Sequence, residues 1–119
     1  MASENGSSIV STNDPVEAVS DAGVVYTDVF VSMGEESLDG KMDAFDGFQI
    51  NEELVSHADS DYLFMHCLPA HRGEEVTNGV IDSKNSVVFD QAENRMWAQM
   101  SLLTFLVHPA AWEAFSELH

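Results

Sequence analysis

Three short apolar runs, separated by segments with helix signals, constrain the fold of this 119-residue chain more than any other feature. They occupy residues 24–27, 62–65 and 86–89 and are rich in valine and aromatic side chains. Continuous apolar character over four residues is typical of a strand that is buried on both faces of a parallel sheet. Strands that alternate with helices predict an α/β layer structure with right-handed crossovers.

The first helix has a clear start signal. Asp14 stands where an N-cap is expected, Pro15 falls in the first turn, and Glu17 follows the cap by three positions. This arrangement predicts a helix that ends near residues 21–23. The β-branched run just before it, at residues 8–12, is consistent with a further strand.

The longest helix is expected at residues 92–107. Its apolar side chains fall on more than one face, which predicts that it packs against more than one partner. Shorter helices are expected at residues 41–45, 51–56 and 109–118. We expect residues 1–7, which are small and polar, to form a flexible leader, and residues 8–119 to form one folded domain.

The chain is strongly acidic, with 4 basic and 21 acidic residues and a net charge of −17. Such a surface gives no counterion-release term with nucleic acid and is repelled by anionic lipid, so we expect neither as a partner. The acidic residues are spread along the chain rather than clustered, which is also what a halophilic protein would carry in concentrated salt.

The cysteine content and the hydropathy of the chain indicate its cellular compartment. The single cysteine, Cys67, cannot form an internal disulfide, and no apolar stretch reaches the roughly 18 residues that a membrane span needs. No basic region followed by an apolar run opens the chain. We therefore expect a soluble, cytoplasmic protein in a reducing compartment.

Polar side chains follow each predicted strand. In an open parallel sheet, ligands bind beyond the carboxyl ends of the strands. Asp28 follows the first strand, His66 and Cys67 end the second, and Arg95 lies after the third. We expect an acid, a thiol, an imidazole and a guanidinium to converge on one edge of the sheet.

Each of these residues also has a simpler interpretation. Asp28 can cap the following turn, and Arg95 can pair with a neighbouring acid on its own helix. His66, Cys67 and His71 include metal-ligating types, but one cysteine and two histidines without a spaced partner cluster are weak evidence for a metal site, and none is predicted.

Three sequence motifs narrow the set of protein families to which the chain can belong. They are DVFVSMG at 28–34, HCLPAHRGEEV at 66–76 and VFDQAENR at 88–95, with FDGFQINEEL at 45–54 between the first two. In this order they resemble the carboxyl-terminal half of the ornithine carbamoyltransferases, over about residues 8–107. The resemblance implies a partial three-layer, doubly wound, Rossmann-like sheet with flanking helices and a long C-terminal helix.

The resemblance also implies an ornithine subsite. By matching position, Asp28 would hold the α-amino group of L-ornithine through a charge-assisted hydrogen bond. Ser32 and Met33, on a loop that closes over the amino acid, would contact its α-carboxylate and α-amino end.

The remaining implied roles concern the reacting groups. Cys67, together with the Leu68 carbonyl, would lie beside the side-chain amine of ornithine. His66 and Arg95 would face carbamoyl phosphate, with Arg95 as a planar donor to its oxygens. The peptide bond between Leu68 and Pro69 would be cis. Cys67 and Arg95 are the two residues expected to act in catalysis, and no metal or organic cofactor is implied.

The chain contains no Ser-x-Arg-Thr-Arg word and no His-Pro-x-Gln word, which in this family belong to the carbamoyl-phosphate domain. We therefore expect residues 8–119 to be a truncated ornithine-binding domain that is inactive alone. Its expected partner is a complementary carbamoyl-phosphate domain or further copies of itself. The alternative is a non-catalytic, self-associating α/β fragment or an amino-acid-binding module.

Overall fold

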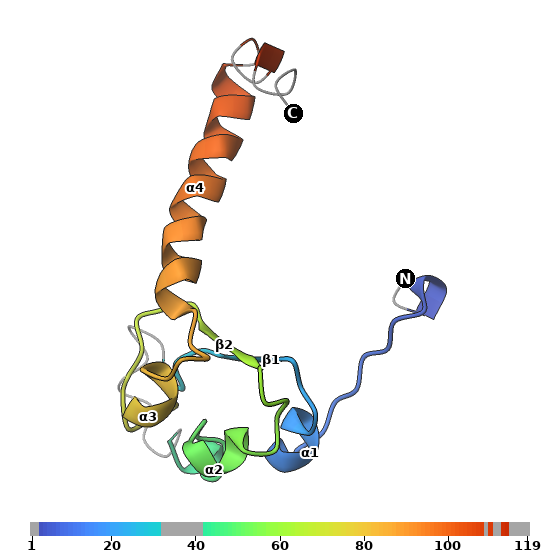
Figure 1. Ribbon diagram of the computed structural model, residues 1–119, viewed down its shortest axis with the longest axis vertical. Coiled ribbons are helices and arrows are strands. Elements are labelled where there is room, and N and C mark those ends of the chain that lie inside the picture. Colours follow the sequence, from blue (N-terminus) through green and yellow to red (C-terminus); the bar gives the residue numbers. More distant parts are fainter. Residues whose placement is uncertain (1–2, 32–41, 109, 111–112, 115–119) are drawn as a thin grey trace.

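The computed structural model describes residues 3–31, 42–108, 110 and 113–114. Within these residues the chain is an α/β unit built on two parallel strands, β1 (Val24–Thr27) and β2 (Leu63–His66) (Figure 1). Short helices lie below the strands in this view, and one long helix projects from them. The helices are α1 (Pro15–Val19), α2 (Glu52–Val55), α3 (Asn78–Ile81) and α4 (Val88–Val107), with 3-10 turns η1 (Ser3–Asn5) and η2 (Met42–Phe45). The α/β class, the parallel sheet with flanking helices and the long C-terminal helix are thus confirmed.

The third predicted strand is wrong in extent. Phe64 donates its N–H to the Asn85 carbonyl, and Val87 donates to the Phe64 carbonyl, so the chain does run beside β2. Only Ser86, however, forms a bridge to Phe64, and α4 begins at Val88. The composition of the run predicts four strand residues, because apolar character alone does not distinguish a strand from the first turn of a buried helix.

The strand expected at residues 8–12 is also wrong. The structure has no strand there, and the side chains of Ile9 and Val10 are 88% and 78% exposed. β-branched residues favour an extended backbone, but a strand also needs a neighbour to pair with. No described segment pairs with this run.

The predicted cap of the first helix is confirmed. The Asp14 carboxylate accepts hydrogen bonds from the N–H groups of Val16 and Glu17, at 2.9 and 3.3 Å. Asn51 caps α2 in the same way, accepting from Leu54 N–H at 2.9 Å. The predicted helix at 41–45 is a 3-10 turn, η2. The final helix expected at 109–118 lies mostly outside the described residues.

The core lies on one face of the strands. Fully buried Phe64 of β2 packs there with Val76, Val80 and Val88. The side chains on the other face are exposed: the exposed fraction is 53% for Val24, 55% for Tyr26 and 44% for Leu63. The expectation that both faces of the strands are buried is therefore wrong for the described residues, because the described elements leave much of that second face exposed.

Most of helix α4 is uncovered. Its N-terminal end packs on β2, and the rest projects away from the α/β unit (Figure 1). Its exposed apolar side chains are Phe89, Met96, Trp97, Met100, Leu102, Leu103, Phe105, Leu106 and Val107. The radius of gyration is 18.4 Å, against about 13.5 Å for a compact domain of this length. None of the described helices is long and apolar enough to cross a membrane.

Candidate functional site

The carboxyl ends of the two strands bring Asp28 and Cys67 together. Because β1 and β2 are parallel and paired from Val24 opposite Leu63 to Thr27 opposite His66, the residues that follow them emerge at the same edge. The Cys67 thiol donates a hydrogen bond to Asp28 Oδ1 at 2.9 Å. The same oxygen accepts from Val29 N–H at 2.7 Å, so no described group of the chain occupies Oδ2.

This contact reinforces the charge state that both groups have at neutral pH. The hydrogen bond from Cys67, followed by the one from Val29, holds the pKa of the Asp28 carboxyl below its ordinary value. Burial, followed by the neighbouring Asp28 carboxylate, raises the pKa of the Cys67 thiol. The pair is therefore an ionised carboxylate and a neutral thiol at neutral pH. A neutral thiol serves as a hydrogen-bond donor rather than as a nucleophile.

Replacing Asp28 by asparagine is expected to lower the pKa of Cys67 without restoring its ordinary value. The substitution removes the negative charge, which favours the thiol, whereas burial remains. Since Cys67 is the only cysteine, the pH dependence of its alkylation rate measures this pKa directly. Asp61→Asn, which removes the same charge before the amino end of β2, should leave the profile unchanged. An unchanged profile in Asp28→Asn would contradict the electrostatic assignment.

A cavity of about 440 Å³ adjoins the thiol. It is lined by residues from the ends of both strands and from the first turns of α4, namely Tyr26, His66, Cys67, Gln91, Ala92, Asn94, Arg95 and Ala98. The structure thus places the Cys67 and Arg95 side chains, 28 positions apart in the chain, around one space.

Arg95 is the basic group available at this cavity. Among the described residues it has no ion-pair partner, and its side chain is exposed. Arg72, by contrast, donates to both carboxylate oxygens of Asp82 and to Asn78. An exposed guanidinium without a carboxylate partner is suited to bind a carbonyl or phosphate oxygen.

Sequence reasoning missed two residues that shape the cavity, Gln91 and Tyr26. Gln91 accepts a hydrogen bond from His66 N–H at 3.1 Å and donates to the Tyr26 hydroxyl at 3.3 Å. It therefore ties α4 to the ends of both strands. A signal was present, because Gln91 lies four residues before Arg95 and so shares its helix face.

His66 is buried beneath the site. Its imidazole has no exposed surface; Nδ1 accepts from Leu68 N–H at 2.8 Å, and Nε2 lies 3.3 Å from Glu75 Oε1. Leu68 itself is half-buried, with φ of 52°, and its bond to Pro69 is cis, as the resemblance implied. The imidazole thus contacts the protein rather than open space.

The two remaining predicted residues, Ser32 and Met33, lie outside the described part of the chain.

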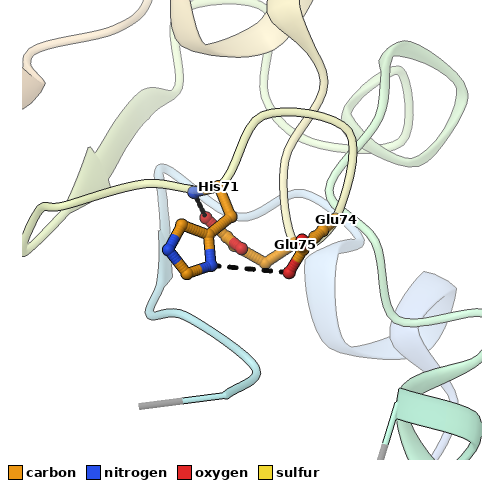
Figure 2. Close-up of side chains that lie close together, drawn as sticks. All are labelled: His71, Glu74 and Glu75. Carbon is orange, nitrogen blue, oxygen red and sulfur yellow. Dashed lines mark hydrogen bonds and ion pairs between the residues drawn. The ribbon is translucent and has the colours of Figure 1, made fainter. Parts of the chain in front are cut away.

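Potential metal ligands gather elsewhere. His71, Glu74 and Glu75 place one donor atom each within 4.8 Å of one another, and Figure 2 shows these side chains clustered under one loop. His71 Nδ1 already lies 3.4 Å from Glu74 Oε2, and Glu75 Oε1 accepts the His71 N–H at 2.6 Å. A cation would have to displace these contacts. Cys67 and His66 do not join this group.

A second hollow, of about 650 Å³, lies beside η2 and is lined partly by Asp43, Asp46 and Glu74. It contains none of the predicted site residues.

The geometry first defines a class: an α/β protein with a candidate small-molecule site at the carboxyl edge of its parallel strands, offering an acid, a thiol and a guanidinium. Residues 1–106 match the model of the Asp/Orn binding domain of aspartate/ornithine carbamoyltransferase. The chain therefore belongs to the aspartate/ornithine carbamoyltransferase family.

Known proteins agree with this assignment. The chain is 64% identical over 104 residues to the catabolic ornithine carbamoyltransferase of Thermoplasma acidophilum, covering 87% of this chain and 34% of that protein. The solved ornithine carbamoyltransferase of Pyrococcus furiosus superposes with a TM-score of 0.80 at 59% identity, over 87% of this chain and 33% of that one. The Giardia lamblia ornithine transcarbamoylase gives 0.77 at 35% identity, with 89% and 33% covered. The chain thus spans about a third of the length of the relatives that it matches.

Proposed function

We propose that this chain supplies the amino-acid side of an enzyme that transfers the carbamoyl group of carbamoyl phosphate to L-ornithine, giving L-citrulline and phosphate. The observation that carries the proposal is the Asp28–Cys67 hydrogen bond at a cavity that also holds Arg95. Because the chain belongs to this family, ornithine or a related amino acid is the expected acceptor of the carbamoyl group.

Asp28 would bind the ornithine α-ammonium group through Oδ2, which no described residue occupies. A charge-assisted hydrogen bond of this kind contributes about 1.5–3 kcal/mol. Ser32 and Met33 would complete this end of the subsite against the α-carboxylate. The ornithine side chain would then extend toward Cys67.

The transfer itself needs orientation more than covalent help. The neutral side-chain amine attacks the carbamoyl carbon, the bond from that carbon to the phosphate oxygen breaks, and the amine nitrogen loses a proton. Arg95 would donate to the oxygens that gain negative charge, while the Cys67 thiol and the Leu68 carbonyl would orient the amine. His66 would reach carbamoyl phosphate only through the loop that it supports, because its imidazole is buried.

A complementary polypeptide would complete the site. The chain spans about a third of its relatives, and the apolar side chains of α4 are exposed on several faces. A second chain or segment that carries the phosphate-binding groups would cover α4 and bring carbamoyl phosphate to Arg95. Self-association through α4 into a homo-oligomer is the second candidate, favoured by the same exposed residues.

A citrulline assay tests the proposal. The isolated chain should form no citrulline above background, whereas mixing it with the remaining two thirds of the Thermoplasma acidophilum relative should produce citrulline. Light scattering on both samples distinguishes a mixed complex from copies of the chain alone. Robust citrulline from the isolated chain, or none from a mixed complex that light scattering confirms, would contradict the assignment.

We further propose that residues 8–119 form the domain unit. We also propose that the protein works in the reducing cytoplasm, where its single thiol stays free. Its net charge of −17 leads us to propose a cytoplasm of high salt concentration. Raising KCl to about 2 M should increase the melting temperature by at least about 5 °C, because screening weakens self-repulsion. Chloride is used because sulfate stabilises proteins generally. A constant or falling melting temperature would argue against salt adaptation.

A further inference from the structure

The loop that carries Cys67 has a backbone that needs external support. Leu68 has φ of 52°, in the left-handed region that a leucine side chain disfavours. Such a conformation persists only where surrounding contacts fix it. The bond that Leu68 N–H donates to His66 Nδ1, at 2.8 Å, is one of those contacts.

Glu75 supplies the others. Its side chain is fully buried, and its Oε1 accepts the His71 N–H at 2.6 Å and lies 3.3 Å from His66 Nε2. His66 and His71 are the residues on either side of the loop 67–70. One carboxylate oxygen therefore contacts both ends of the segment that presents Cys67 and Leu68. Figure 2 shows its contact with the His71 N–H.

The backbone of Glu75 is held by the hydrophobic core. Ile50 N–H donates to the Glu75 carbonyl at 2.8 Å, and the adjacent Val76 is fully buried in the core. Burying a carboxylate is costly unless its partners are well placed. A buried glutamate anchored on one side by the core and bonded on the other to a strained loop is suited to hold that loop in place.

We infer that Glu75 is a positioning residue that holds both ends of the 67–70 loop, through a hydrogen bond from the His71 N–H and through contact with the buried His66 imidazole, and so keeps the Cys67 thiol against Asp28. Its catalytic consequence rests on the proposed function, whereas this clamp on the loop does not. Because His66 Nδ1 accepts from Leu68 N–H, the ring proton is on Nε2, which lies 3.3 Å from Glu75 Oε1 without forming a hydrogen bond to it.

Alkylation of the only cysteine tests the clamp in the chain as it is, without substrate. Glu75→Leu keeps the side-chain volume but removes the acceptor, and should raise the rate of Cys67 alkylation by iodoacetamide about three- to tenfold at neutral pH. Glu75→Gln keeps an acceptor oxygen and should remain within about twofold of wild type. Glu74→Gln, the exposed neighbour, should change nothing.

Leu54→Ala controls for general loosening, because it creates a cavity in α2 away from the loop. If folded Glu75→Leu reacts at the wild-type rate, or if Leu54→Ala accelerates alkylation as much, the inference is overturned. Nitrogen-15 shifts of His66 in the unmodified chain give a measurement independent of any variant's folding. A proton on Nε2 and none on Nδ1 is expected, whereas a proton on Nδ1 would contradict the acceptor role that the structure gives it. Neither readout depends on carbamoyl transfer, so failure here leaves the proposed function standing.

Discussion

Replacing Phe64 by alanine is expected to lower the free energy of unfolding by about 3–5 kcal/mol, because deletion of a buried aromatic side chain leaves a cavity. Phe64 is 0% exposed, lies in β2 opposite Val25, and exchanges backbone hydrogen bonds with the turn that leads into α4. A small domain has only about 5–15 kcal/mol of stability in total, so this loss is a large fraction of it. Urea denaturation followed by circular dichroism measures the change.

The matched control is Leu63→Ala, one position earlier on the same strand. Leu63 is 44% exposed because successive side chains of a strand point to opposite faces. Its loss should cost about 1 kcal/mol or less. Equal losses for the two variants would mean that the second face of the strands is packed as tightly as the first.

Replacing Arg95 by alanine is expected to reduce kcat/KM for citrulline formation by the complemented chain by about 10²–10³-fold. This is the size of effect seen when one donor to a developing oxyanion is removed. Arg95 is the exposed guanidinium at the cavity beside Cys67, so its loss leaves the transferred group without that donor. Steady-state kinetics with varied carbamoyl phosphate measures the effect.

Arg72→Ala is the control, since it removes an equal charge from an arginine bound to Asp82. Exposed ion pairs contribute little to stability, so this variant should retain nearly full kcat/KM. If both arginine variants lose activity equally, the effect is one of net charge or folding rather than of a specific donor. If Arg95→Ala retains full activity, Arg95 does not touch the reacting group.

The helix cap and the edge where the strands end were predictable from local signals in the sequence. The Asp14 cap was predictable because a short acidic side chain before Pro15 has one main way to satisfy the first N–H groups of a helix. The approach of Asp28 to Cys67 followed from a topological rule, because parallel strands end at one edge. These features depend on the nearest neighbours in the chain or on strand direction alone.

Features that depend on distant packing were not predictable. Residues 86–89 have strand composition, yet α4 begins at Val88, and the composition of the run does not reveal this. Glu74 and Glu75 are chemically identical neighbours, but one is exposed and the other fully buried against His66. No local pattern separates them, because burial is decided by which side of the loop faces the core.

Calorimetric titration of the isolated chain with L-ornithine and, separately, with carbamoyl phosphate tests most directly whether the chain carries the amino-acid half of a carbamoyltransferase site. L-Ornithine should bind with a dissociation constant in roughly the millimolar range, and Asp28→Asn should abolish the heat while Asp61→Asn preserves it. Carbamoyl phosphate alone should give no saturable heat, because the net charge of −17 repels a dianion. Saturable binding of carbamoyl phosphate together with no binding of L-ornithine would contradict the account.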